Sequence, residues 1–124
     1  MKNLQGKRAG GAHVDGAPFV TLLIGDQPGL EVFASGLDKW IDVPVLPGSI
    51  VVNIGGTLQK LSGGRCTATM HRVNPLKVPQ RRVSLPYFRM PRMDCPLEPF
   101  DGSFLIQRER GLDYALDLVL KGSI

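Results

Sequence analysis

The sequence of 124 residues holds little of what marks several common classes of protein. Its two cysteines, Cys66 and Cys95, are too few and too far apart for a disulfide framework or a zinc site. No apolar run approaches the roughly 20 residues that cross a bilayer, and residues 1–4 do not resemble a signal peptide. We therefore expect a cytoplasmic protein without a membrane partner.

Acidic residues are missing from the middle of the chain. Between Val43 and Met93 there are eight Lys or Arg residues and no Asp or Glu. Such a positive half can attract an anionic ligand, or it can be an ordinary solvated face. Only this asymmetry supports a nucleic-acid-binding module, because the chain has one Trp, two Tyr and five Phe and no basic stripe interleaved with them. We expect no nucleic-acid partner.

Glycine and proline, by contrast, are abundant, with 15 and 10 residues, which favours many turns and short strands. Short apolar runs bounded by turn residues predict strands, and Pro86 indicates that the last of them either lies at an edge or ends there. The predicted strands are 19–24, 30–34, 39–43, 50–54 (as a central strand) and 82–88. This order predicts an all-β fold in which two sheets form a jelly roll.

The sequence predicts two helical segments. Residues 57–62 are expected to form a short helical turn between two pairs of glycines. Apolar residues at helical spacing predict one C-terminal helix over residues 112–120, followed by Gly122.

The chain has only two histidines, and both belong to short motifs that suit a metal ion. In His13-Val14-Asp15 the single intervening residue puts both ligand side chains on one side of an extended segment. His71 can complete a set of two imidazoles and one carboxylate. Such a set occupies one face of an iron(II) ion and leaves the other positions open, which is the ligand pattern of non-haem iron oxygenases.

A second motif follows ten residues after His71. In Arg82-Val83-Ser84 the alternation of an extended strand points Arg82 and Ser84 to the same face and Arg81 to the other. A guanidinium and a hydroxyl on one face suit a carboxylate.

Together these motifs resemble a known family. AHVD, HRV after fifty-five residues, and then RVSLPYF resemble the 2-oxoglutarate and Fe(II)-dependent dioxygenases of the isopenicillin N synthase-like group. The resemblance covers residues 10 to 90 approximately, including PFVTLLIGDQPGLEVF and KWIDVPVLPGSIVVNIGGTLQKLSGGR. Ordered pieces at compatible spacings are more specific than any one motif.

The resemblance implies a double-stranded β-helix and a site. His13, Asp15 and His71 would bind Fe(II), and Arg82 and Ser84 would bind the distal carboxylate of 2-oxoglutarate. With O2 the enzyme would oxidise a small organic molecule and release succinate and CO2, without a catalytic side chain beyond the metal ligands. Aromatic residues such as Phe88 more often belong to the core than to a site, but Phe88 shares strand parity with Arg82 and Ser84, so lining of the pocket is the alternative.

Three parts of the chain are expected: a flexible lead-in over residues 1–12, the jelly-roll core over 13–92, and a C-terminal extension with the helix over 93–124. Family members usually carry N-terminal helices and a strand before the H-x-D motif, and here twelve residues precede His13. The jelly roll would thus be partial. We expect self-association through the uncovered sheet, or a longer polypeptide, and slow turnover. The alternative is a truncated, non-catalytic jelly-roll domain.

Overall fold

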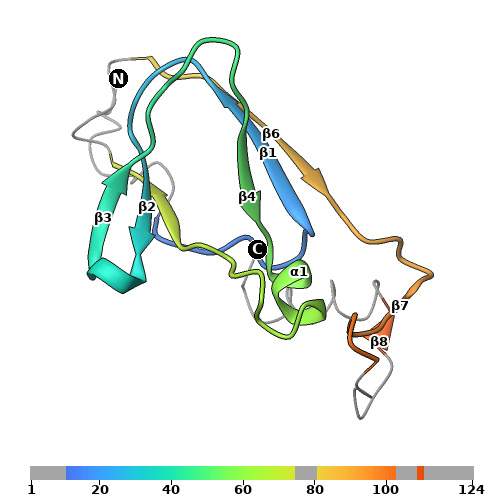
Figure 1. Cartoon of the computed structure of the whole chain (residues 1–124). Coiled ribbons are helices and arrows are strands. Elements are labelled where there is room, and N and C mark those ends of the chain that lie inside the picture. Colours follow the sequence, from blue (N-terminus) through green and yellow to red (C-terminus); the bar gives the residue numbers. More distant parts are fainter. Residues whose placement is uncertain (1–10, 75–80, 103–108, 111–124) are drawn as a thin grey trace, which may run out of the picture.

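The computed structural model describes residues 11–74, 81–102 and 109–110, and their regular structure is chiefly β (Figure 1). The helical elements are the 3-10 turn η1 and the short helix α1. The elements in chain order are β1 (Val20–Gly25), β2 (Leu30–Ala34), η1 (Ser35–Leu37), β3 (Lys39–Asp42), β4 (Val51–Ile54), α1 (Gly56–Leu61), β5 (His71–Val73), β6 (Ser84–Arg89), β7 (Pro96–Leu97) and β8 (Glu109–Arg110).

Six of these strands form two antiparallel sheets. One sheet has the order β4-β1-β6 and the other the order β3-β2-β5, while β7 and β8 pair separately. Figure 1 shows β2, β3 and β5 on one side of the molecule and β1, β4 and β6 on the other. Leu23 and Val51 of the first sheet line one cavity together with Leu30 of the second, so these faces look toward each other. Two sheets packed face to face are the arrangement of the predicted jelly roll.

The strand predictions are confirmed to within about two residues, as is the short helix that follows β4. The edge position inferred from Pro86 is also confirmed, because β6 pairs with β1 alone among the described strands. The prediction that 50–54 forms a central strand is wrong, since β1 holds the centre of the described sheet and β4 an edge. An apolar run suggested burial on both faces, yet Val52 is 61% exposed.

Some strands were not predicted, and some predicted segments lie outside the described residues. The sequence did not reveal β5, β7 and β8, which are only two or three residues long. The predicted helix at 112–120 and the first ten residues of the predicted lead-in lie outside the described residues. In the part of the chain that the structure describes, no helix has the length and apolarity to cross a membrane.

A pair of glycines brings the start of α1 against the segment that precedes β1. The backbone N–H of Gly56 donates to Asp15 O at 2.7 Å, and that of Gly55 donates to Phe19 O at 2.9 Å. A Cβ atom at Gly55 would collide with the carbonyl of Pro18, and one at Gly56 would lie 2.5 Å from Gly16 O. Glycine is therefore required at both positions for this close approach, which fixes the backbone of Asp15.

A buried carboxylate fastens β5 to β2. Glu31, on β2, is 3% exposed and accepts hydrogen bonds from Arg72 Nε at 2.6 Å and Asn74 Nδ2 at 3.0 Å. The guanidinium of Arg72 also lies 3.9 Å from the centre of the Trp40 ring. Arg72 and Glu31 are opposite each other in the register, next to the pair of Val32 and His71. This network thus holds the strand that carries His71.

Breaking the Arg72–Glu31 pair should destabilise the fold. Arg72→Met leaves a buried carboxylate with fewer donors, and we expect the free energy of unfolding to fall by about 2 kcal/mol, less than for a fully buried pair because Arg72 is partly exposed. Urea denaturation measures the loss. The control is Arg92→Met, which breaks the exposed Arg92–Asp94 pair and should change nothing measurable. Equal stability of the two variants would contradict this role.

The outer face of the first sheet is apolar. Because side chains alternate along a strand, the residues that share a face with Leu22 point away from the second sheet. We call these residues the outer face: Leu22, Ile24, Val52, Leu85 and Tyr87. The last four are 51%, 61%, 67% and 60% exposed. A contiguous apolar surface of this kind favours association.

Self-association of the chain through the outer face stays a prediction. We expect light scattering to give a mass above that of one chain, and Leu85→Ser to shift the mass toward the monomer. Leu37→Ser is the control, because Leu37 is also exposed, at 64%, but lies in η1 away from the outer face. A wild-type chain that stays monomeric at high concentration would refute the prediction.

Candidate metal centre

The two histidines meet through their backbones. His13 N–H donates to His71 O at 3.0 Å, and His71 N–H donates to His13 O at 2.9 Å, which makes an isolated antiparallel bridge. The two imidazole rings lie with their centroids 4.4 Å apart. Residue 13 precedes the first sheet and residue 71 begins β5 of the second, so this bridge brings together side chains that are far apart in the sequence.

Hydrogen bonds fix the orientation of both rings. The Nδ1 atom of His13 lies 2.7 Å from Gly11 O, and that of His71 lies 3.0 Å from Thr69 O. A carbonyl oxygen can only accept, so each Nδ1 carries the proton and donates it. Each neutral ring then has its free lone pair on Nε2, which is the form that binds a metal ion.

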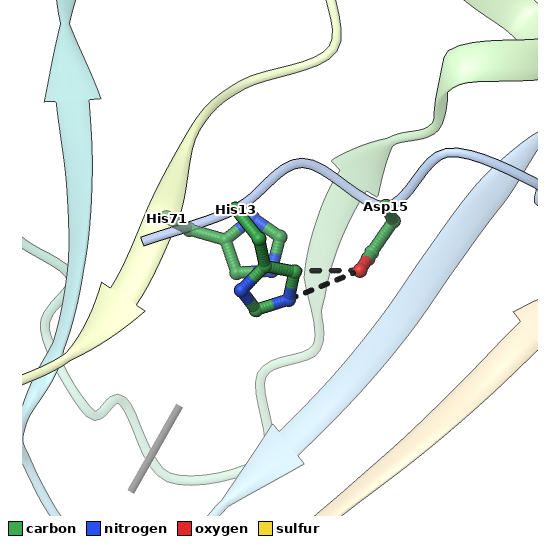
Figure 2. A group of neighbouring side chains, drawn as sticks. All are labelled: His13, Asp15 and His71. Atoms are coloured by element: carbon green, nitrogen blue, oxygen red, sulfur yellow. Dashed lines mark ion pairs between the residues drawn. The ribbon is translucent and has the colours of Figure 1, made fainter. Parts of the chain in front are cut away.

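Asp15 completes the cluster, and Figure 2 shows its carboxylate directed at both rings. Its Oδ1 lies 3.5 Å from His13 Nε2 and 3.6 Å from His71 Nε2. One ligand atom from each of the three residues lies within 4.8 Å of the other two. Adjacent ligand atoms on one ion, each about 2.1 Å from it, would be about 3 Å apart. The two carboxylate–imidazole distances exceed this spacing by about half an ångström, and the three residues fit a divalent metal ion once the side chains contract around it.

The other carboxylate oxygen is held by the protein. Oδ2 of Asp15 accepts a hydrogen bond from Thr21 Oγ1 at 2.6 Å and one from Asn53 Nδ2 at 2.9 Å. Thr21 on β1 and Asn53 on β4 are opposite each other in the register. Neither residue belongs to a motif that the sequence displays. Their signal was a polar side chain inside each of two otherwise apolar strands.

Arg82 and Ser84 share a face, in agreement with strand parity. Arg82 donates from a terminal guanidinium nitrogen to Ser84 Oγ at 3.1 Å and from Nε to Gln27 O at 3.3 Å. Arg82 is half-buried and lines a narrow cavity of about 30 Å³ with Leu23 and Val51, whereas Arg81 is exposed. A positive charge on the wall of this cavity suits a small anion.

The two motifs lie along one face of the first sheet. Ser84 is opposite Gly25 in the register, while Phe88 is opposite Thr21, which holds Asp15. Thr21 and Gly25 are four residues apart on β1, which corresponds to about 13 Å. The cluster of His13, Asp15 and His71 and the side chain of Arg82 are thus at two ends of the same face, each beside its own cavity.

A larger cavity of about 450 Å³ opens beside the cluster. His13 and Asp15 form its polar wall. Its remaining lining is apolar: Val14, Ala17, Pro18, Phe88 and Met90. Phe88 is therefore a lining residue of the pocket, as its strand parity indicates.

Comparison with known proteins gives the family. The sequence profile of the 2OG-Fe(II) oxygenase superfamily matches residues 6–91. Among curated relatives, gibberellin 3-beta-dioxygenase 2-3 of Triticum aestivum is 39% identical over 95 residues, which are 75% of this chain and 26% of the relative. The chain belongs to the 2OG-Fe(II) oxygenase superfamily.

Solved structures agree with this assignment. The rice dioxygenase for auxin oxidation matches with a TM-score of 0.79 and 28% identity over 95% of this chain and 42% of that one. JOX2 in complex with 2OG, Fe and JA matches with a TM-score of 0.71 and 30% identity over 89% of this chain and 34% of that one. The predicted jelly roll and the resemblance to this family are both confirmed. The chain spans about a quarter of the length of the curated relatives it matches.

Removing the carboxylate of the cluster should remove metal binding. We expect Asp15→Ala to abolish stoichiometric binding of Fe(II) in an anaerobic titration, because two imidazoles alone leave the ion without its anionic ligand. Asp94→Ala is the control, since Asp94 is an exposed carboxylate paired with Arg92 outside the cluster. Unchanged stoichiometry and affinity in Asp15→Ala would show that the assignment of ligands is wrong.

Proposed function

We propose that this protein is an Fe(II)- and 2-oxoglutarate-dependent oxygenase that oxidises a small organic molecule and releases succinate and CO2. One observation carries the proposal: one ligand atom each of His13, Asp15 and His71 lies within 4.8 Å of the other two. Membership of the superfamily and the presence of 2OG and Fe in the JOX2 complex support it.

His13, Asp15 and His71 would hold the iron. Bound iron would supply O2 activation coupled to decarboxylation of the co-substrate, chemistry that no side chain offers by itself. The chain's own residues bind the metal ion and orient the side chains that hold it. The carbonyl oxygens of Gly11 and Thr69 keep both Nδ1 atoms protonated, so that both Nε2 atoms are available, and the buried Glu31 network keeps His71 in place.

Arg82 and Ser84 would bind the distal carboxylate of 2-oxoglutarate. The guanidinium of Arg82 already donates to Ser84 Oγ, so both groups can turn to one carboxylate without a change of strand register. The narrow cavity must widen to admit the acid, and the bonds of Arg82 to Gln27 O and Ser84 would then be exchanged for charge-assisted ones.

The larger cavity would receive the substrate that is oxidised. It touches two of the proposed metal ligands, His13 and Asp15, so a molecule inside it would present a carbon atom to the iron. Its other walls carry no charge. An apolar part of the substrate, such as a ring or an aliphatic chain, therefore fits this position best.

Arg82 should govern co-substrate affinity. A hydrogen bond to a charged group contributes about 1.5–3 kcal/mol, so Arg82→Ala should weaken binding of 2-oxoglutarate by roughly 10- to 100-fold. The readout is the charge-transfer absorption band that forms when 2-oxoglutarate chelates Fe(II), titrated without O2. Binding of Fe(II) itself should be unchanged.

Arg81→Ala is the matched control, because Arg81 is adjacent in sequence but exposed. Equal losses in both variants would contradict the role of Arg82. If wild-type protein loaded with Fe(II) gives neither the band with 2-oxoglutarate nor succinate with O2, the proposed function is wrong, and the non-catalytic domain is the better description.

A further inference from the structure

The carboxylate of Asp15 is bonded unequally. Oδ2 accepts two hydrogen bonds, from Thr21 and Asn53, whereas Oδ1 faces the Nε2 atoms of both histidines. Thr21 is only 4% exposed, so its hydroxyl is buried and its hydrogen bond to Asp15 is shielded from solvent. Two donors at 2.6 and 2.9 Å are as many hydrogen bonds as the two lone pairs of Oδ2 accept. Only Oδ1 is left to face the metal position.

We propose that Thr21 and Asn53 are positioning residues that restrict Asp15 to binding a metal ion through a single carboxylate oxygen, Oδ1. This inference rests on the proposed function. An octahedral ion bound by two imidazoles and one carboxylate oxygen keeps three positions open. If both oxygens bind, one of these positions is lost. Three open positions are needed: two for a co-substrate that chelates through two atoms, and one for O2.

The placement of the two donors makes them suited to this role. They stand opposite each other on β1 and β4, on the face that carries the site, so the sheet itself sets the spacing between hydroxyl and amide. The backbone of Asp15 is fixed independently, because its carbonyl accepts from Gly56 N–H at 2.7 Å. The backbone of Asp15 and its Oδ2 atom are therefore both held in place. For the carboxylate to rotate until both oxygens bind the metal ion, Oδ2 must lose a hydrogen bond to Thr21 or Asn53.

The test is infrared spectroscopy of the whole chain, labelled with ¹³C at the aspartate carboxyl groups and loaded with Co(II), an air-stable substitute for Fe(II). In the metal-bound minus metal-free spectrum, the antisymmetric and symmetric carboxylate bands are widely separated when one oxygen binds and close when both bind. We expect a wide separation for the wild type. Thr21→Val keeps the side-chain shape but removes the donor, and it should narrow the separation.

Two further variants make the test independent of any one substitution. Asn53→Leu removes the other donor from a partly exposed position and should also narrow the separation. Thr21→Ser retains the hydroxyl and should restore the wide separation. Where a donor is lost, the affinity for Co(II) should fall by about 10- to 100-fold, as is usual when a partner of a metal ligand is removed.

The control is Thr57→Val, which deletes another buried threonine hydroxyl that donates to Ala17 O and not to Asp15. Its separation should remain wide. The inference is overturned if Thr21→Val and Asn53→Leu bind one Co(II) per chain with a wide separation, or if Thr57→Val narrows it equally. A wild-type chain that binds no Co(II) would instead overturn the proposed function itself.

Discussion

The candidate metal centre depends on one short segment, residues 13–15, being bonded to both sheets at once. His13 pairs through its backbone with His71 at the start of β5, in the second sheet. Asp15 is held by Thr21 and Asn53 of the first sheet. The cluster is therefore located where the two sheets meet, and its geometry can be no better defined than the packing of one sheet on the other.

Several contacts outside the three-residue cluster restrict the backbone of its members. The two glycines before and at the start of α1 permit a backbone contact that a Cβ atom would block, and that contact fixes Asp15. The buried Glu31 fixes β5 through Arg72. Both devices act on the backbone of a proposed ligand. They limit the freedom of the site before any metal ion is bound, and such preorganisation reduces the entropy lost on binding.

Polar groups are used sparingly around the site. Each imidazole has one carbonyl partner, the carboxylate has two donors on one oxygen, and the cavity beside the cluster is otherwise apolar. In such surroundings an unpaired polar atom is costly, so each hydrogen bond has a strong effect on side-chain orientation. Oδ1 of Asp15 and the Nε2 atoms of both histidines, which face one another, are then the atoms placed to hold a cation.

The sequence by itself determined the motifs, most of the strands and the parity of Arg82 and Ser84, because these follow from the local alternation of an extended chain. It also placed Pro86 at an edge, since a missing N–H is a local property. Only the tertiary structure decided that 50–54 is at an edge of the described sheet and that β5 exists. The hydrogen bonds of Thr21 and Asn53 to Asp15, and of Arg72 to Glu31, were also decided only there. A strand's neighbours and the partner of a buried polar group are set by residues far away in the chain, so no local pattern contains them.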